Sequence, residues 1–208
     1  MDTMTALPLR PDKTAARRLA RAAVASIPEA AAAAESAAAA RRFLELPEFA
    51  AADCLLAFLS MRGEIDTLPL VRAALAAGKT VAAPRIEGAD LAFVPLGGDW
   101  ETWPRDAYGI PEPPAGARAL TLGELGRRRV IVAAPGLAFD RAGGRLGRGK
   151  GFYDRFLRAA REAARKGGGG LVACGFCLAA QIAAATPCGP EDEGVDLVVT
   201  GAETIRIR

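Results

Sequence analysis

The sequence of 208 residues contains no histidine. This absence excludes Ser–His–Asp and Cys–His catalysis, and it excludes every zinc site that needs a histidine ligand. Acid–base chemistry therefore falls to Glu, Asp, Lys or Tyr. A bound metal ion is expected to be a hard cation held by oxygen ligands.

Long apolar runs and long basic runs are also missing. No uninterrupted apolar segment reaches membrane-spanning length, and the charged N-terminal residues are not typical of a signal peptide. The net charge is only +3, and no Lys/Arg run is interleaved with aromatic residues. We therefore expect a cytoplasmic protein with neither a membrane nor a nucleic acid as partner. We also expect a monomer or weak homo-oligomer.

Cysteine is scarce, with four residues in the chain. Cys174 and Cys177 form a C-x-x-C pair, but the pair lies inside the apolar run LVACGFCL and no second pair exists. Zinc or redox motifs rarely have that setting, so buried structural thiols in a reducing compartment are expected.

Hydrophobic residues make up 51% of the chain, which is typical of a packed globular protein. Pro8 and Pro11 disfavour a helix at the N-terminus. The sequence therefore predicts a flexible tail over residues 1–10 and a single domain over residues 11–208.

The pattern of apolar residues alternates between helix and strand. Asp12 is a suitable N-cap for a helix over residues 13–27, and a second helix should run from Pro28 to about Leu46, where Pro47 ends it. A strand at 53–59, a helix begun by Asp66 or Thr67, and a strand at 79–84 form a parallel βαβ unit. Further strands are expected at 91–95, 130–132, 171–176 and 197–200, with a helix at about 151–166. The fold class is therefore α/β: a three-layer domain with a mainly parallel, Rossmann-like sheet flanked by helices.

The most informative segment is the loop between the strand at 130–132 and the helix that follows. It is rich in glycine and carries Arg145, Arg148 and Lys150. Glycines allow backbone N–H groups to approach an anion, and a helix N-terminus adds its dipole, so the segment predicts phosphate binding. It matches neither standard motif: Gly151 replaces the Ser or Thr of a P-loop, and Phe152 replaces the third glycine of a dinucleotide fingerprint.

Other candidate residues lie outside this loop. Glu64 follows the strand at 53–59, where ligands of parallel sheets bind. Lys13 and Arg17 are neighbours on the first helix, and an anion between them would offset their repulsion. Asp196, near another strand, could help to hold magnesium. The irregular segment 97–116 carries aromatic side chains that either cover an edge of the core or stack on a flat ring.

The chain resembles the 5-formyltetrahydrofolate cyclo-ligases, also called 5,10-methenyltetrahydrofolate synthetases. The run PGLAFDRAGGRLGRGKGFYDRFL, at 135–157, carries the resemblance. Matches in the same order are Lys13-x-x-x-Arg17, LSMRGEIDT, YGIPEP at 108–113, Gln181 and VDLVVT at 195–200. Phe152, Glu191 and Gly201 depart from the family pattern, at positions where tyrosine, histidine and an acidic residue are common.

The resemblance implies a reaction and a set of site residues. The reaction is the cyclisation of 5-formyltetrahydrofolate to 5,10-methenyltetrahydrofolate with ATP and Mg²⁺, through a phosphorylated formyl oxygen, releasing ADP and phosphate. The implied ATP-binding residues are Lys13, Arg17, Arg145, Leu146, Gly147, Arg148, Gly149, Lys150, Gly151, Phe152 and Tyr153. The implied substrate-binding residues are Leu59, Met61, Glu64, Tyr108 and Phe152, and the implied metal ligands are Asp154 and Asp196.

Within that reaction, the chemistry suggests roles for three residues. Lys150 and Arg148 would stabilise the transferring phosphoryl group, and Glu64 would orient the pterin or the reacting nitrogen. Two alternatives stay open. One is another ATP-dependent enzyme on the same scaffold, and the other is a non-catalytic protein that binds phosphate or a nucleotide.

Overall fold

A computed structural model describes residues 12–61, 63–107 and 109–207 of the protein. A seven-stranded sheet forms its centre. The strand order is β10-β9-β7-β4-β1-β2-β3. Five of these strands are parallel neighbours, and the two edge strands β3 and β10 run antiparallel to β2 and β9. The strands are β1 (Cys54–Ala57), β2 (Thr80–Glu87), β3 (Asp90–Pro95), β4 (Arg129–Ala134), β7 (Gly170–Phe176), β9 (Leu197–Val199) and β10 (Thr204–Arg206). The mainly parallel α/β sheet is confirmed.

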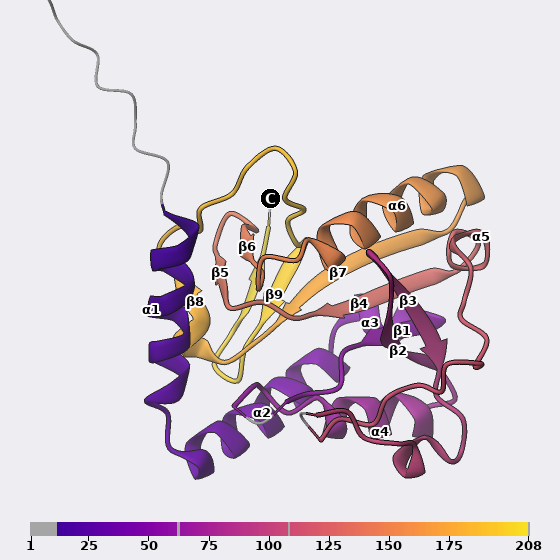
Figure 1. Cartoon of the computed structure of the whole chain (residues 1–208), viewed down its shortest axis with the longest axis horizontal. Coiled ribbons are helices and arrows are strands. Elements are labelled where there is room, and N and C mark those ends of the chain that lie inside the picture. The colour runs from indigo at the N-terminus through magenta and orange to yellow at the C-terminus, as the bar shows by residue number, and fades with distance from the viewer. Residues whose placement is uncertain (1–11, 62, 108, 208) are drawn as a thin grey trace, which may run out of the picture.

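Both faces of the sheet are covered, because neighbouring residues of each central strand point into different cores. Leu55 and Ala57 belong to one hydrophobic cluster, and Cys54 and Leu56 belong to the other. Figure 1 shows α2 (Glu29–Leu44) and α4 (Leu68–Ala76) on one side of the sheet and α6 (Phe152–Gly167) on the other. The continuous apolar runs of the sequence follow from this burial on both faces.

The βαβ unit at β1–α4–β2 forms as predicted, and its loop is fixed by hydrogen bonds. Asp66 lies one residue before Thr67, the N-cap of α4, and its Oδ1 accepts from Leu68 N, the first N–H of the helix, at 2.9 Å. The hydroxyl of Thr67 instead donates to Phe58 O at 2.8 Å, and Thr67 is fully buried. These bonds hold the residues that follow β1 at the carboxyl edge of the sheet.

Several boundaries differ from the sequence prediction. The second helix ends at Leu44, and Pro47 starts a short helix, α3 (Pro47–Ala51), because proline is favourable at a first helical position. The strand expected at the end of the chain is β9, and β10 follows it after a short turn. The first helix, α1 (Lys13–Ala25), begins as expected, since Asp12 accepts a hydrogen bond from Thr14 N at 2.8 Å.

A second, three-stranded sheet was not predicted. Its order is β6-β5-β8, with β5 (Ala138–Asp140) and β6 (Arg145–Leu146) forming an antiparallel hairpin and β8 (Ile182–Ala183) pairing in parallel with β5. The glycine-rich segment therefore begins inside a hairpin. In Figure 1, α1 lies beside this small sheet, and both lie next to the carboxyl edge of the large sheet.

The remaining elements are short. They are the 3₁₀ helices η1 (Trp100–Thr102) and η2 (Ala179–Gln181) and the single-turn α5 (Leu122–Leu125). Within the described ranges, every helix is too short or too polar to cross a membrane. The predicted tail over residues 1–10 lies outside the described residues.

Candidate active site

A cavity of about 590 Å³ opens at the carboxyl ends of β1 and β4. Phe58 and Leu59, which follow β1, and Pro135 and Gly136, which follow β4, line it. The chain continues from β1 to β2 on one side, whereas β4 and β7 lie on the other side, so the cavity sits at the point where the strand order reverses. Ligands of open parallel sheets bind at this position, and the volume suits a small molecule.

The glycine-rich segment forms one wall of the cavity. Gly149 and Gly151 have positive φ angles of 101° and 70°, a conformation that favours glycine. Gly151 is the N-cap of α6, and no side chain of the described residues caps that helix end. The free backbone N–H groups of the first turn of α6 and the positive end of the helix dipole therefore remain available to an anion.

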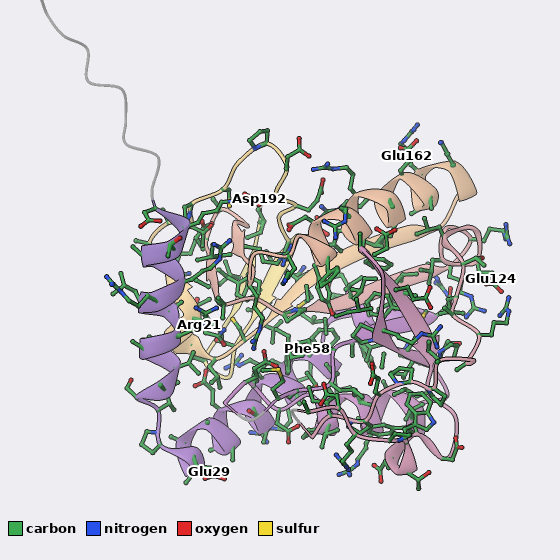
Figure 2. All side chains as sticks on the ribbon, viewed as in Figure 1. Arg21, Glu29, Phe58, Glu124, Glu162 and Asp192 are labelled. Atoms are coloured by element: carbon green, nitrogen blue, oxygen red, sulfur yellow. The ribbon has the colours of Figure 1, made fainter. Side chains whose placement is uncertain are left out.

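Five basic side chains predicted from the sequence all line this cavity: Lys13, Arg17, Arg145, Arg148 and Lys150. Lys13 donates to Asp192 at 2.5 Å; Figure 2 shows Asp192 close to the N-terminal end of α1. Arg17 donates from Nε to Gly147 O at 3.0 Å, which joins α1 to the glycine-rich segment.

The other three cations differ in how they are paired. Arg145 is buried, with 3% of its side chain exposed, and it donates to Asp154 at 2.5 Å. Arg148 is half exposed and donates to Glu64 at 2.6 Å. Lys150 is exposed, and its ammonium group has no hydrogen-bond or ion-pair partner among the residues that the structure describes. Its ammonium group is therefore free to meet an anionic ligand.

The predicted metal ligands are not brought together. Asp154 lines the cavity, but Asp196 does not. Asp196 lies before β9, at the amino end of that strand, and its carboxylate accepts from Ala173 N at 2.7 Å and from Arg161 at 3.2 Å. The sequence prediction placed Asp196 near an end of the sheet without identifying which end. The cavity lies at the carboxyl ends of the strands, whereas Asp196 lies at the amino end of β9.

The described residues contain no cluster of three or more acidic or cysteine side chains that could hold a metal ion alone. Magnesium is commonly held by one or two carboxylates together with nucleotide phosphates and water. Asp154 Oδ1 accepts from Arg145 and from Glu193 N, whereas Oδ2 makes no hydrogen bond with the described residues. The site therefore fits a magnesium ion shared with a phosphate ligand.

The opposite wall of the cavity is mainly apolar, and its charged residues are Glu64, Arg85, Asp106 and Glu112. Of the substrate-binding residues predicted from the sequence, Leu59, Met61, Glu64 and Phe152 line the cavity, and Tyr108 lies outside the described residues. Glu64 accepts from Met61 N at 3.1 Å and from Arg148, so its carboxylate connects the two walls. Further apolar lining comes from residues that the sequence prediction missed, namely Ile86, Leu91, Ile110, Pro111 and Pro113.

Glu112 is the most informative residue that the sequence prediction missed. It lies between Pro111 and Pro113 in the apolar wall, lines the cavity, and forms no ion pair or side-chain hydrogen bond with any described residue. Its place in the matched segment YGIPEP was a signal, but nothing in the spacing indicated that the segment would fold against β2 and β3.

Two buried polar atoms of the site lack partners in the described part of the chain: Arg145 Nε and the hydroxyl of Tyr153. The Tyr153 ring packs edge-on against Phe93 and lies 5.7 Å from the Arg145 guanidinium. Burial raises the pKa of Tyr153 above its ordinary value, so the hydroxyl stays protonated and can donate. Unsatisfied donors beside a cavity indicate that a bound polar ligand completes the site.

Gln181 matches the family pattern but has a supporting role. Its Nε2 donates to Gly136 O at 2.7 Å, and its Oε1 accepts from Leu178 N at 2.9 Å. These bonds hold the turn after β4 against the segment that follows β7, and the side chain does not line the cavity.

Comparison with known proteins gives consistent matches. A model of the 5-formyltetrahydrofolate cyclo-ligase family matches residues 9–201. The chain is 30% identical over 168 residues to a probable 5-formyltetrahydrofolate cyclo-ligase of Caenorhabditis elegans, covering 79% of this chain and 80% of that protein. It is 36% identical over 123 residues to the 5-formyltetrahydrofolate cyclo-ligase of Escherichia coli K12, covering 58% and 65%.

Solved structures match over almost the whole chain. The NMR structure of Aquifex aeolicus 5,10-methenyltetrahydrofolate synthetase superposes with a TM-score of 0.76 at 26% identity, covering 94% of this chain and 93% of that one. A 5,10-methenyltetrahydrofolate synthetase from Mycoplasma pneumoniae superposes with a TM-score of 0.67, covering 91% and 99%. At 13% identity, the second match supports the fold alone.

Proposed function

Because the chain belongs to the 5-formyltetrahydrofolate cyclo-ligase family, we propose that it closes 5-formyltetrahydrofolate to 5,10-methenyltetrahydrofolate and converts ATP to ADP and phosphate. The single observation that carries the proposal is the two-sided cavity, with a basic, glycine-rich wall opposite an apolar wall. We also propose a cytoplasmic setting, and the burial of Cys54, Cys174 and Cys177 fits thiols with a structural role.

The basic wall supports binding of the nucleotide phosphates. Arg17, Arg148 and Lys150 line it together with the uncapped N-terminus of α6. Mg²⁺ would neutralise charge on the phosphates, and Asp154 is the carboxylate that would hold it beside them. Phosphoryl transfer needs positioning and positive charge more than a side-chain base, which suits a site without histidine.

The chemistry proceeds in two steps. The formyl oxygen takes the γ-phosphoryl group, the bond from that phosphorus to the ADP oxygen breaks, and the N5–formyl group becomes an iminium-like phosphate ester. The neighbouring N10 then attacks the formyl carbon and loses its proton to water or to the departing phosphate. The bond between the formyl carbon and the phosphate oxygen breaks, and phosphate leaves with the former formyl oxygen. Lys150 and Arg148 stabilise the phosphoryl group in the first step, and Glu64 orients the reacting nitrogen.

The Arg148–Glu64 ion pair supports this division of roles. It links a residue of the phosphate wall to a residue of the apolar wall across 2.6 Å. A phosphoryl group that approaches Arg148 competes with Glu64 for the guanidinium, so nucleotide binding would release Glu64 toward the second substrate. Binding of the two substrates is thereby coupled through one side-chain pair.

A direct assay tests the proposed function. Purified protein with 5-formyltetrahydrofolate and Mg·ATP should produce the near-ultraviolet absorbance of the methenyl product, and either chelation of Mg²⁺ or omission of ATP should abolish the rise. A protein that binds ATP but gives no absorbance change would contradict the folate assignment and favour another substrate on the same scaffold.

The free carboxylate of Glu112 supports a more specific prediction. The pterin ring presents its 2-amino N–H and its N3–H side by side, a donor pair that two carboxylate oxygens can accept together. Glu112→Gln should raise the KM for 5-formyltetrahydrofolate about 10-fold, because a charge-assisted hydrogen bond is lost, and leave the KM for ATP unchanged.

Steady-state kinetics with each substrate varied in turn would measure this effect. Glu101→Gln is a matched control, since Glu101 belongs to the same segment and pairs with Arg72 rather than lining the cavity. Equal changes in both KM values, or a change as large in the control, would remove Glu112 from pterin recognition.

A further inference from the structure

We propose that Asp140 is a positioning residue that holds two walls of the nucleotide site in one arrangement. The inference rests on the proposed function, because it concerns the same nucleotide site. Asp140 is the last residue of β5, is 6% exposed, and does not line the cavity. Its effect on a ligand must therefore pass through the residues that it holds.

One carboxylate oxygen of Asp140 closes the turn of the β5–β6 hairpin. Oδ1 accepts from Ala142 N and from Gly144 N, both at 2.9 Å. Two backbone hydrogen bonds also close this turn: Gly143 N donates to Asp140 O at 3.2 Å, and Asp140 N donates to Gly144 O at 3.1 Å. The residue immediately after the turn is Arg145, so this oxygen fixes where the basic, glycine-rich segment begins.

The other oxygen binds a segment far away in the sequence. Oδ2 accepts from Thr186 N at 2.7 Å and from Thr186 Oγ1 at 2.6 Å, across 46 positions of sequence. That segment continues to Asp192, which accepts from Lys13, and to Glu193, whose N–H donates to Asp154 Oδ1. A single carboxylate therefore joins the β5–β6 hairpin, which carries Arg145, to the segment from Thr186 to Glu193, which carries Asp192.

The atoms around the Asp140–Thr186 contact are closely packed. Gly144 faces Thr186 Oγ1 and Asp140 Oδ2 so closely that an added methyl group would overlap both atoms. Gly143 has a φ of +87°, and Val195 N donates to its carbonyl at 2.9 Å. Because the turn is enclosed between Thr186 and Val195, losing a bond to Asp140 should shift the hairpin rather than be absorbed locally.

Asp140 keeps its charge in this setting. Burial by itself would raise its pKa, but the hydrogen bonds from Thr186, Gly144 and Ala142 outweigh burial and leave the pKa below its ordinary value. The ionised carboxylate can thus accept all four hydrogen bonds at once, which an amide cannot.

Two substitutions at Thr186 provide a matched test. Thr186→Val removes the hydroxyl donor and keeps the shape and the backbone N–H, whereas Thr186→Ser keeps both donors. Thr186→Val should weaken ATP binding about fivefold, corresponding to one hydrogen bond, and Thr186→Ser should bind as the wild type does. Asp140→Asn should weaken ATP binding more than Thr186→Val does. The asparagine NH₂ group is a donor, so it cannot accept the hydrogen bond from Thr186 N.

Titration calorimetry with ATP and, separately, with 5-formyltetrahydrofolate measures both affinities without turnover. The proposal predicts weaker ATP binding with unchanged folate binding. Equal loss of both affinities, or unchanged ATP binding in folded Thr186→Val and Asp140→Asn proteins, would overturn it. If the wild type binds ATP but makes no methenyl product, the proposed function fails, while the ATP affinities still decide the role of Asp140.

Discussion

Replacing Lys150 by alanine should lower kcat about 100- to 1000-fold, the loss typical when one charged group that stabilises a transition state is removed. Lys150 is exposed and lines the cavity, and its ammonium group has no ion-pair or hydrogen-bond partner within the described residues. Its charge therefore contributes little to the fold. The free energy of unfolding should stay within about 0.5 kcal/mol of the wild-type value, as for other surface substitutions.

Rapid-mix kinetics of methenyl formation and urea denaturation would measure the two quantities. Lys166→Ala is the matched control, because Lys166 is an exposed lysine near the end of α6 that pairs with Glu162 at 3.0 Å, outside the cavity. Lys150→Arg should recover part of the activity, since the charge is retained with a different shape. A Lys150→Ala variant with wild-type kcat would exclude this side chain from phosphoryl transfer.

Much of the fold could be predicted because its long elements carry a clear sequence signal. The strand β1 and residues 81–84 of β2 are continuous apolar runs, as expected for strands buried on both faces, and α6 has apolar residues at helical spacing. By contrast, β5, β6 and β8 are two or three residues long and have no period to detect. Their pairing depends on contacts such as Asp140 to Thr186, which join residues far apart in the sequence.

The candidate site was predictable where its residues share one segment or follow one strand. Arg145 to Tyr153 lie together in the sequence, and Glu64 follows a strand whose carboxyl end could be located. Asp192 and Glu112 were missed because their loops reach the cavity only through tertiary packing. Asp196 shows the opposite error: a carboxylate beside a strand was expected at the cavity, but it lies at the strand's amino end and binds Arg161.

In the described site, three of the basic side chains form ion pairs with acidic side chains that also line the cavity. Lys13 pairs with Asp192, Arg145 with Asp154, and Arg148 with Glu64. Each pair holds a cation in position in the absence of a ligand. A phosphate that binds the cation would compete with its carboxylate partner. The pairs differ in burial, and burial decides which of them also stabilise the fold.

Arg145→Met should therefore lower both stability and activity. Arg145 has 3% of its side chain exposed and Asp154 has 18%, so removal of the guanidinium leaves a largely buried carboxylate without its cation. The free energy of unfolding should fall by about 3 kcal/mol, the lower end of the range for breaking a buried pair. Arg129→Met, which breaks an exposed pair with Asp53, is the control and should change stability much less.

The double variant Arg145→Met/Asp154→Leu separates the two roles of the pair. Two apolar side chains of similar volume can replace a buried ion pair at little cost, so urea denaturation should show most of the lost stability restored. Turnover should not return, because the cation beside the phosphates and the carboxylate proposed for magnesium are both gone. If turnover did return with stability, Arg145 would act only in folding, and phosphate binding would rest on Arg17, Arg148 and Lys150 alone.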